Sequence, residues 1–219
     1  MANWFGILWQ VQQIILDLLY PPSCVCGRQA GAWLCLACVA AIEYFPAPRC
    51  IKCDLSIPKI SQTMLCQTCE RQPMLYLDGI RTVAPHKDPL RQAIHALKYE
   101  KQPEVALRLG WLLVECWRTR GGFQIDGLLP IPLHANRQQE RGFNQSERLA
   151  NVMSQHLATP LCDNILIRTR DTASQVGLSR QERLQNIRNA FGIIFVSLVS
   201  HRRQGCLYLT RLHANDVEA

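Results

Sequence analysis

Apolar residues recur every three or four positions in several stretches of this chain, which is the spacing of one buried face of an α-helix. The first such stretch runs from Trp4 to Tyr20 and stops at Pro21 and Pro22. It contains neither Lys nor Arg that would bind an anionic membrane surface. We therefore expect this amphipathic helix to dock on the rest of the chain.

Two further helices are predicted downstream. The first starts at Asp88, a favourable N-cap that is followed by proline, and closes at Lys98 and Tyr99. The second runs from about Pro103 to Trp117, and Gly121-Gly122 end it.

Short apolar runs between the helical stretches predict strands. They are Leu77 to Pro85, Ile125 to Leu133, Ile165 to Ile167 and Ile193 to Val199. Because strands alternate with helices, we expect an α/β fold with a parallel sheet. Ligands of such sheets bind at the carboxyl ends of the strands.

A polar, basic segment follows the second of these strands. We expect a loop from His134 to Arg141, after which Asn144 caps a helix and Glu147 completes a capping box. The free N–H groups at the start of that helix, its dipole, and Arg137 or Arg141 would all face an anion. The sequence therefore predicts an anion-binding loop here.

The segment from Arg168 to Asn189 is also rich in arginine. Its first part reads as a loop containing Gly177, and its second part as a polar helix. It could close as a flap over an anionic substrate. An exposed basic helix accounts for the same composition equally well, so both interpretations stay open.

Eight cysteines form four closely spaced pairs. They are Cys24 and Cys26, Cys35 and Cys38, Cys50 and Cys53, and Cys66 and Cys69. Two such pairs complete a tetrahedral site, so the spacing predicts two structural Zn²⁺ sites. The simplest assignment is sequential, and interleaved pairing stays open. A disulfide framework is the alternative, which the lack of a signal peptide disfavours.

Positive charge is concentrated in the second half of the chain. The 219 residues carry a net charge of +7, and eleven Arg stand against five acidic residues between Arg137 and Arg211. Arginine suits bidentate contact with phosphate, so this excess favours nucleic acid or a phosphorylated small molecule as partner over a solvated face. The chain has no apolar run long enough for a transmembrane segment. Together with reduced cysteines, this predicts a cytoplasmic protein.

Three segments resemble the ComF family. They are LLYPPSCVCG with the cysteine pairs, IHALKYE with PIPLHANRQQERGFNQSERLA, and TASQVGLSRQERLQNIRNAF. The resemblance implies an N-terminal double zinc ribbon followed by a domain of the type I phosphoribosyltransferase fold. It also implies a role in DNA uptake by competent bacteria, with single-stranded DNA and the DNA-uptake machinery as partners.

The same resemblance implies a phosphate site. The segment from His134 to Asn144 would contact pyrophosphate, and that from Thr172 to Asn186 would form a hood over the active site. The candidate anion-binding residues are then Arg137, Arg141, Asn144, Gln145, Gln175, Arg180 and Arg183. Mg²⁺ would accompany phosphoribosyl pyrophosphate if that donor binds. No catalytic residue is assigned.

The chain departs from the family after Phe191. There the family has two adjacent aspartates and Thr-Thr-Gly, which hold the ribose and the 5′-phosphate of the donor. The residues from Gly192 onward contain neither motif. We therefore expect a C-terminally incomplete phosphoribosyltransferase-like sheet, or a changed reading frame, with little or no turnover.

The expected organisation has four parts. They are an amphipathic helix (1–22), the double zinc ribbon (23–76), the phosphoribosyltransferase-like domain (77–191) and a divergent tail (192–219). The function expected is that of a ComF-like accessory protein of DNA uptake that binds an anionic ligand or single-stranded DNA. The alternatives are a phosphoribosyltransferase with an unknown acceptor and an inactive remnant.

Overall fold

A computed structural model describes residues 23–27, 32–58, 62–73, 76–120, 125–194 and 206–209. The helix expected from Trp4 to Tyr20, the Gly121-Gly122 stop and most of the tail after residue 194 lie outside these residues. None of the helices within the described ranges combines the length and the apolar character needed to cross a bilayer.

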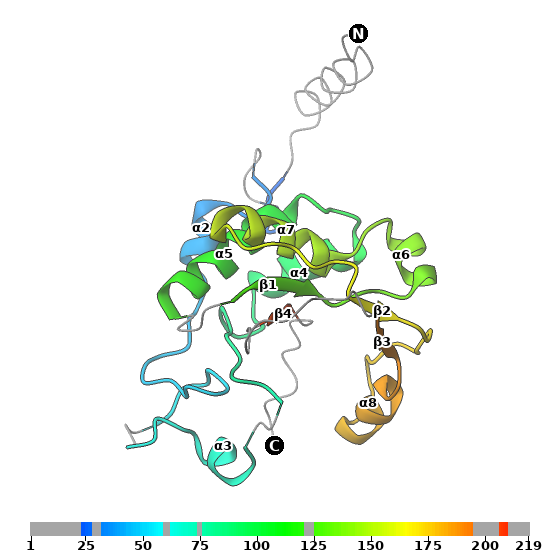
Figure 1. Cartoon of the computed structure of the whole chain (residues 1–219). Helices are drawn as coiled ribbons and strands as arrows, with labels where there is room; N and C mark the ends of the chain where they lie inside the picture. The colour runs from blue at the N-terminus through cyan, green and yellow to red at the C-terminus, as the bar shows by residue number, and fades with distance from the viewer. Residues whose placement is uncertain are drawn as a thin grey trace.

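Four helices precede the first strand of the described chain, and strands are interspersed with helices only from β1 onward. In order, the described elements are α2 (Leu36–Ala40), α3 (Gln67–Arg71), α4 (Leu90–Tyr99), α5 (Val105–Arg120), β1 (Gly127–Pro130), α6 (Ala135–Arg141), α7 (Gln145–Leu157), β2 (Leu166–Arg168), α8 (Arg180–Ile187), β3 (Phe191–Ile193) and β4 (Cys206–Leu209). In Figure 1, α4, α5 and α7 gather above β1 and β4, while α3 and α8 project below them, at the lower left and the lower right.

Strand β1 is the centre of the parallel part of the fold. It pairs in parallel with β4, Gly127 lying opposite Cys206. Its other edge meets the chain at Leu161, because the Leu128 N–H donates to the Pro160 carbonyl at 2.8 Å. Strands β2 and β3 form a separate antiparallel pair. Within the described residues, parallel pairing is thus confined to β1, and the expected phosphoribosyltransferase-like parallel sheet is not shown.

The core lies between the helices and β1. All four residues of β1 are buried, which agrees with the prediction of a buried strand in this region. Helix α5 packs on α7 and β1 through a cluster that contains Val114, Leu128, Ala150 and Met153. A larger cluster joins α4 and α5 to the first cysteine group. The apolar stripes predicted for these helices therefore form the interior.

The strand predicted from Leu77 to Pro85 is wrong. Its backbone donors are used by the second cysteine turn instead of a neighbouring strand. The Ile80 N–H donates to the Lys52 carbonyl at 2.6 Å, and the Thr82 N–H donates to Asp54 Oδ2 at 2.7 Å. This segment is consequently an extended connection that fastens the cysteine turn to the rest of the molecule.

The loop predicted from His134 to Arg141 is also wrong, because residues 135–141 form helix α6. The His134 side chain accepts a hydrogen bond from the Asn136 N–H at 3.4 Å and caps the helix. Gly142, at φ 85°, ends it by donating its N–H to the Gln138 carbonyl at 2.7 Å. Because no residue of α6 is buried, its sequence lacks the apolar periodicity from which a helix is predicted.

Helix boundaries differ slightly from expectation. Helix α4 has Pro89 as its N-cap, not Asp88, because the Asp88 carboxylate accepts hydrogen bonds from the Arg91 guanidinium at 2.9 and 3.0 Å. It ends at Tyr99, as predicted. Helix α5 continues to Arg120, three residues beyond the predicted end.

Candidate functional site

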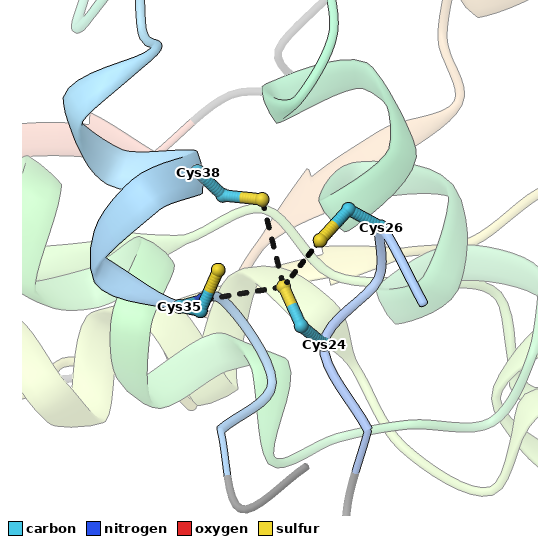
Figure 2. A group of neighbouring side chains, drawn as sticks. All are labelled: Cys24, Cys26, Cys35 and Cys38. Carbon is cyan, nitrogen blue, oxygen red and sulfur yellow. Dashed lines mark hydrogen bonds between the residues drawn. The ribbon is translucent and has the colours of Figure 1, made fainter. Parts of the chain in front are cut away.

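The first cysteine group lies beside the main core. Cys24 and Cys26 stand on a turn in which Gly27, at φ 68°, donates its N–H to the Cys24 carbonyl at 2.6 Å. Cys35 caps α2 and Cys38 lies within it. The four thiols point toward one another in Figure 2, with the Cys24 sulfur 3.3 Å from that of Cys26 and 3.6 Å from that of Cys38.

The second cysteine group repeats this plan at the far side of the molecule. Cys50 and Cys53 stand on a turn, Cys66 caps α3, and Cys69 lies within that helix. The Cys53 and Cys66 sulfurs are 3.6 Å apart. The Cys66 N–H donates to the Cys50 sulfur at 3.3 Å. In each group a short helix begins at a cysteine, which points backbone N–H groups at the sulfurs.

Both groups have the dimensions of a four-thiolate metal site. In each, the four sulfurs lie within 4.8 Å of one another, and the grouping is the sequential one. A tetrahedral ion with metal–sulfur bonds of about 2.3 Å requires sulfurs about 3.8 Å apart, close to the separations observed. The ten cysteines whose side chains the structure describes, from Cys24 to Cys162, are all free of disulfides. The donor set therefore fits a metal such as zinc.

The pKa values of the second group differ with local hydrogen bonding. Burial acts to raise the pKa of Cys50, but N–H groups of Cys53, Cys66 and Lys52 outweigh it and lower the pKa to about 7. Burial raises the pKa of Cys69 to about 11, to which hydrogen bonding with Cys66 adds. A bound cation would favour the thiolate form throughout the group.

The two groups differ in how they are anchored. Cys24, Cys35 and Cys38 belong to the large apolar cluster that includes α4 and α5. The second group has a cluster of only three buried residues among those described, Cys50, Ile57 and Cys69. Apolar packing therefore fastens the first group much more firmly than the second.

Four of the predicted anion-binding residues lie near the junction of α6 and α7. Arg137 is exposed and pairs with Glu140 on its own helix, at 3.2 Å. Arg141 donates a hydrogen bond to the side-chain oxygen Oε1 of Gln145, and its guanidinium lies 5.7 Å from the centre of the Tyr99 ring. The structure thus brings Arg141 and Gln145 into contact at the start of α7.

Asn144 has a structural role at this junction. Its side chain is 6% exposed, and its Oδ1 accepts from the Ser146 N–H at 3.0 Å. Its Nδ2 donates to the Ile131 carbonyl at 3.2 Å. The predicted N-cap is confirmed, although the bond goes to Ser146 and not to Glu147. Asn144 therefore fixes the start of α7 against the end of β1.

The other three predicted residues lie on a different part of the molecule. Gln175 is half-buried in the loop before α8, while Arg180 and Arg183 are on α8 itself. In Figure 1, the β2–β3 pair separates α8 from α6. Ser179 and Glu182 form a reciprocal capping box at the start of α8. Two residues of the expected hood, Ser179 and Glu182, therefore serve to cap α8.

One link between these two regions was not expected. The Asn136 side-chain amide donates to Asp171 Oδ2 at 2.8 Å, and His134 Nδ1 lies 3.6 Å from the same oxygen. This contact ties the start of α6 to the loop that leads to α8. The residues are 35 positions apart, and no sequence periodicity relates them.

A pocket of about 410 Å³ lies away from the basic residues discussed above. It is lined by residues before the second cysteine group and by the last turns of α5, including Tyr44, Phe45, Arg49, Cys116 and Arg120. Burial raises the pKa of the Cys116 thiol to about 11, and the negative charge of Asp54 adds to the effect.

The geometry defines a protein with two four-cysteine modules attached to a mixed helix and strand body. The chain is 33% identical to DNA utilization protein YhgH of Escherichia coli K12 over 166 residues, 74% of this chain and 71% of that protein. It is 31% identical to Competence protein F of Haemophilus influenzae over 164 residues, 73% of this chain and 69% of that protein. The chain belongs to the ComF family. No family model matches it, and no solved structure gives a significant match.

Proposed function

We propose that this protein is a ComF-type accessory factor of DNA uptake or utilisation. The observation that carries this proposal is the identity of about one third, over most of the chain, with relatives named for competence and for DNA utilization. Two cysteine modules and an arginine-rich second half accompany that similarity. The ligand that we propose is single-stranded DNA.

We further propose that both cysteine groups hold Zn²⁺. The sulfur separations of 3.3 to 3.6 Å and the N–H donors aimed at the sulfurs support this assignment. A closed site of four thiolates is structural, so the ion would stabilise the fold and perform no chemistry. Under this proposal residues 23–76 are a double zinc ribbon.

For the body we propose a phosphoribosyltransferase-like arrangement of residues 77–191. The support is the order strand, helix, capped helix at the carboxyl end of β1, to which β4, from the tail, adds a parallel neighbour. Ligands of α/β folds bind at such strand ends. Arg137 and Arg141 stand there on α6, and Arg180 is the exposed first residue of α8.

The test is a salt titration of DNA binding with the zinc-loaded, full-length protein. Anisotropy of a fluorescent oligo(dT) of about 20 nucleotides reports binding in a series of NaCl concentrations. We expect the logarithm of the affinity to fall linearly with the logarithm of salt, by about 0.7 for each phosphate contact. Arg137→Ala and Arg180→Ala should each reduce the magnitude of that slope by about 0.7, the value of one phosphate contact.

Arg71→Ala provides a matched control, because Arg71 is an exposed arginine on α3, distant from α6 in Figure 1. It should leave the slope unchanged. Absence of binding, or binding that does not respond to salt, would contradict the DNA proposal.

A phosphoribosyltransferase is the second candidate. It is favoured by the junction of α6 and α7, where Arg141 and the start of α7 could receive a phosphate. Calorimetric titration with phosphoribosyl pyrophosphate and Mg²⁺ separates the two candidates. Saturable donor binding would favour the transferase. Its absence, together with salt-dependent DNA binding, would favour the accessory protein.

A further inference from the structure

Asp54 is a buried carboxylate directly after the second cysteine turn. It is 4% exposed, at φ 64°, and its own N–H donates to the Cys50 carbonyl at 2.9 Å. Its Oδ2 accepts from the Thr82 N–H at 2.7 Å and from Arg120 Nη1 at 2.8 Å, and it lies 3.2 Å from Arg49 Nη2. Thr82 and Arg120 lie outside the cysteine module, so this oxygen joins the turn to the body.

Arg81 extends the same network. Its guanidinium donates to the Ile51 carbonyl in the cysteine turn at 3.1 Å and to the Arg120 carbonyl at the end of α5 at 2.6 Å. Arg120 in turn donates to the Thr82 carbonyl at 2.9 Å and to the Cys116 sulfur at 2.9 Å. The last turn of α5 is therefore held directly by the Asp54 carboxylate and, through Arg81, by the backbone of the cysteine turn.

This network attaches the second module to the body. The module has a small apolar cluster of its own, whereas the first group is part of the large core. A buried carboxylate between two guanidinium groups is stable only while all partners are in place, because removal of one leaves an uncompensated buried charge. The geometry of Asp54 depends on the turn, and the turn carries two metal ligands.

We propose that Asp54 couples metal binding at the second cysteine group to the structure of the last turn of α5. The inference rests on the proposed binding of metal to that group. With metal bound, the Cys50–Cys53 turn presents the Asp54 carboxylate to Arg49 and Arg120. Loss of the metal displaces the Asp54 carboxylate and breaks its ion pair with Arg120. The 410 Å³ pocket then loses the part of its lining that Arg49 and Arg120 form. Asp54 is thus a positioning residue.

Hydrogen–deuterium exchange of peptides from α5, read by mass spectrometry on the full-length protein, tests the coupling. In the zinc-loaded wild type the last turn of α5 should be protected. Removing the second metal site with Cys66→Ser and Cys69→Ser should raise exchange there about tenfold or more. Asp54→Asn should produce the same rise while the protein still carries two zinc ions.

Asp88→Asn is the matched control. Asp88 also pairs with an arginine, Arg91 at 2.9 Å, but its side chain is 45% exposed and its partners Arg91 and Gln92 both lie on α4. It should leave the exchange of α5 unchanged. In the Asp54→Asn background, the two serine substitutions should add no further exchange at the last turn of α5, because the link is already broken.

Coupling is reciprocal, so it can also be read from the side of α5. Arg120→Gln should speed the transfer of one of the two zinc ions to a chromogenic chelator and leave the other unaffected. This measurement does not require the last turn of α5 to stay folded. If each zinc ion were transferred at the same rate from Arg120→Gln as from the wild type, that result would count against the coupling.

Failure of the coupling and failure of the proposed metal sites give different results. Two bound zinc ions together with unaltered exchange of α5 in Asp54→Asn would overturn the coupling alone. A wild-type protein that binds no zinc would overturn the coupling and the proposed metal sites together.

Discussion

Gly110 marks the closest approach of α5 to α7, and replacing it with alanine tests how tightly the body is packed. A Cβ atom at this position would lie 2.6 Å from Val152 Cβ and 2.7 Å from Val152 Cγ1. Non-bonded carbon atoms do not approach this closely in folded proteins, so the helices would have to move apart. Because α7 begins at the Asn144 cap beside β1, such a shift would also displace the proposed phosphate site.

Two effects of Gly110→Ala oppose each other. Alanine is the better helix former by about 1 kcal/mol. Overpacking of a core costs about 1–3 kcal/mol, and the upper end applies here because Val152 Cβ is fixed to the backbone and cannot rotate away. We expect a net loss of about 1–2 kcal/mol. For a chain of this size, that lowers the Tm by about 2–8 °C.

Thermal unfolding of the zinc-saturated protein, followed by circular dichroism, measures the effect of Gly110→Ala. Arg108→Ala is the control, since Arg108 is an exposed residue on the same helix, and it should stay within about 0.5 kcal/mol of wild type. A Tm for Gly110→Ala equal to or above that of the wild type would show that helix propensity outweighs packing here, and would refute the reasoning.

Two other predictions concern single side chains. Asn144→Ala removes the cap of α7 and the bond to Ile131, and should lower the free energy of unfolding by about 2 kcal/mol in urea titration. Asn151→Ala, exposed on the same helix, should change it little, and equal effects would argue against the cap. The Cys116 thiol, with its pKa raised to about 11 by burial, should be thiolate in about one molecule per thousand at pH 8. Its alkylation by iodoacetamide, followed by mass spectrometry, should therefore be about a hundredfold slower in the native than in the urea-unfolded protein, and comparable rates would contradict its burial.

Helices with a clear apolar stripe were predictable from the sequence. Helices α4, α5 and α7 lie where the spacing of apolar residues predicts helices. That spacing is regular because one face of each helix packs on the core. Helix α6 has no buried residue, so its sequence shows no such spacing of apolar residues. The paired spacing of the cysteines predicted which side chains meet, since a short turn brings each pair together whatever the rest of the chain does.

Contacts between distant segments were not predictable. Leu77 to Pro85 has strand-like residues, yet its backbone donors bond to Lys52 and Asp54, which no local pattern reveals. Asp54 meets Arg120 across 66 positions, and Asn136 meets Asp171 across 35. Arg137 and Arg180, which the family resemblance assigns to one phosphate site, lie on two different helices, α6 and α8.

The pairing of β1 has a consequence for synthesis on the ribosome. Both of its partners in the described chain, the bridge at Leu161 and strand β4, are made after it. Until residue 161 leaves the exit tunnel, the nascent Gly127–Pro130 segment presents unpaired amides and two leucines to its surroundings. We expect this interval to be the time at which the growing polypeptide most needs a chaperone.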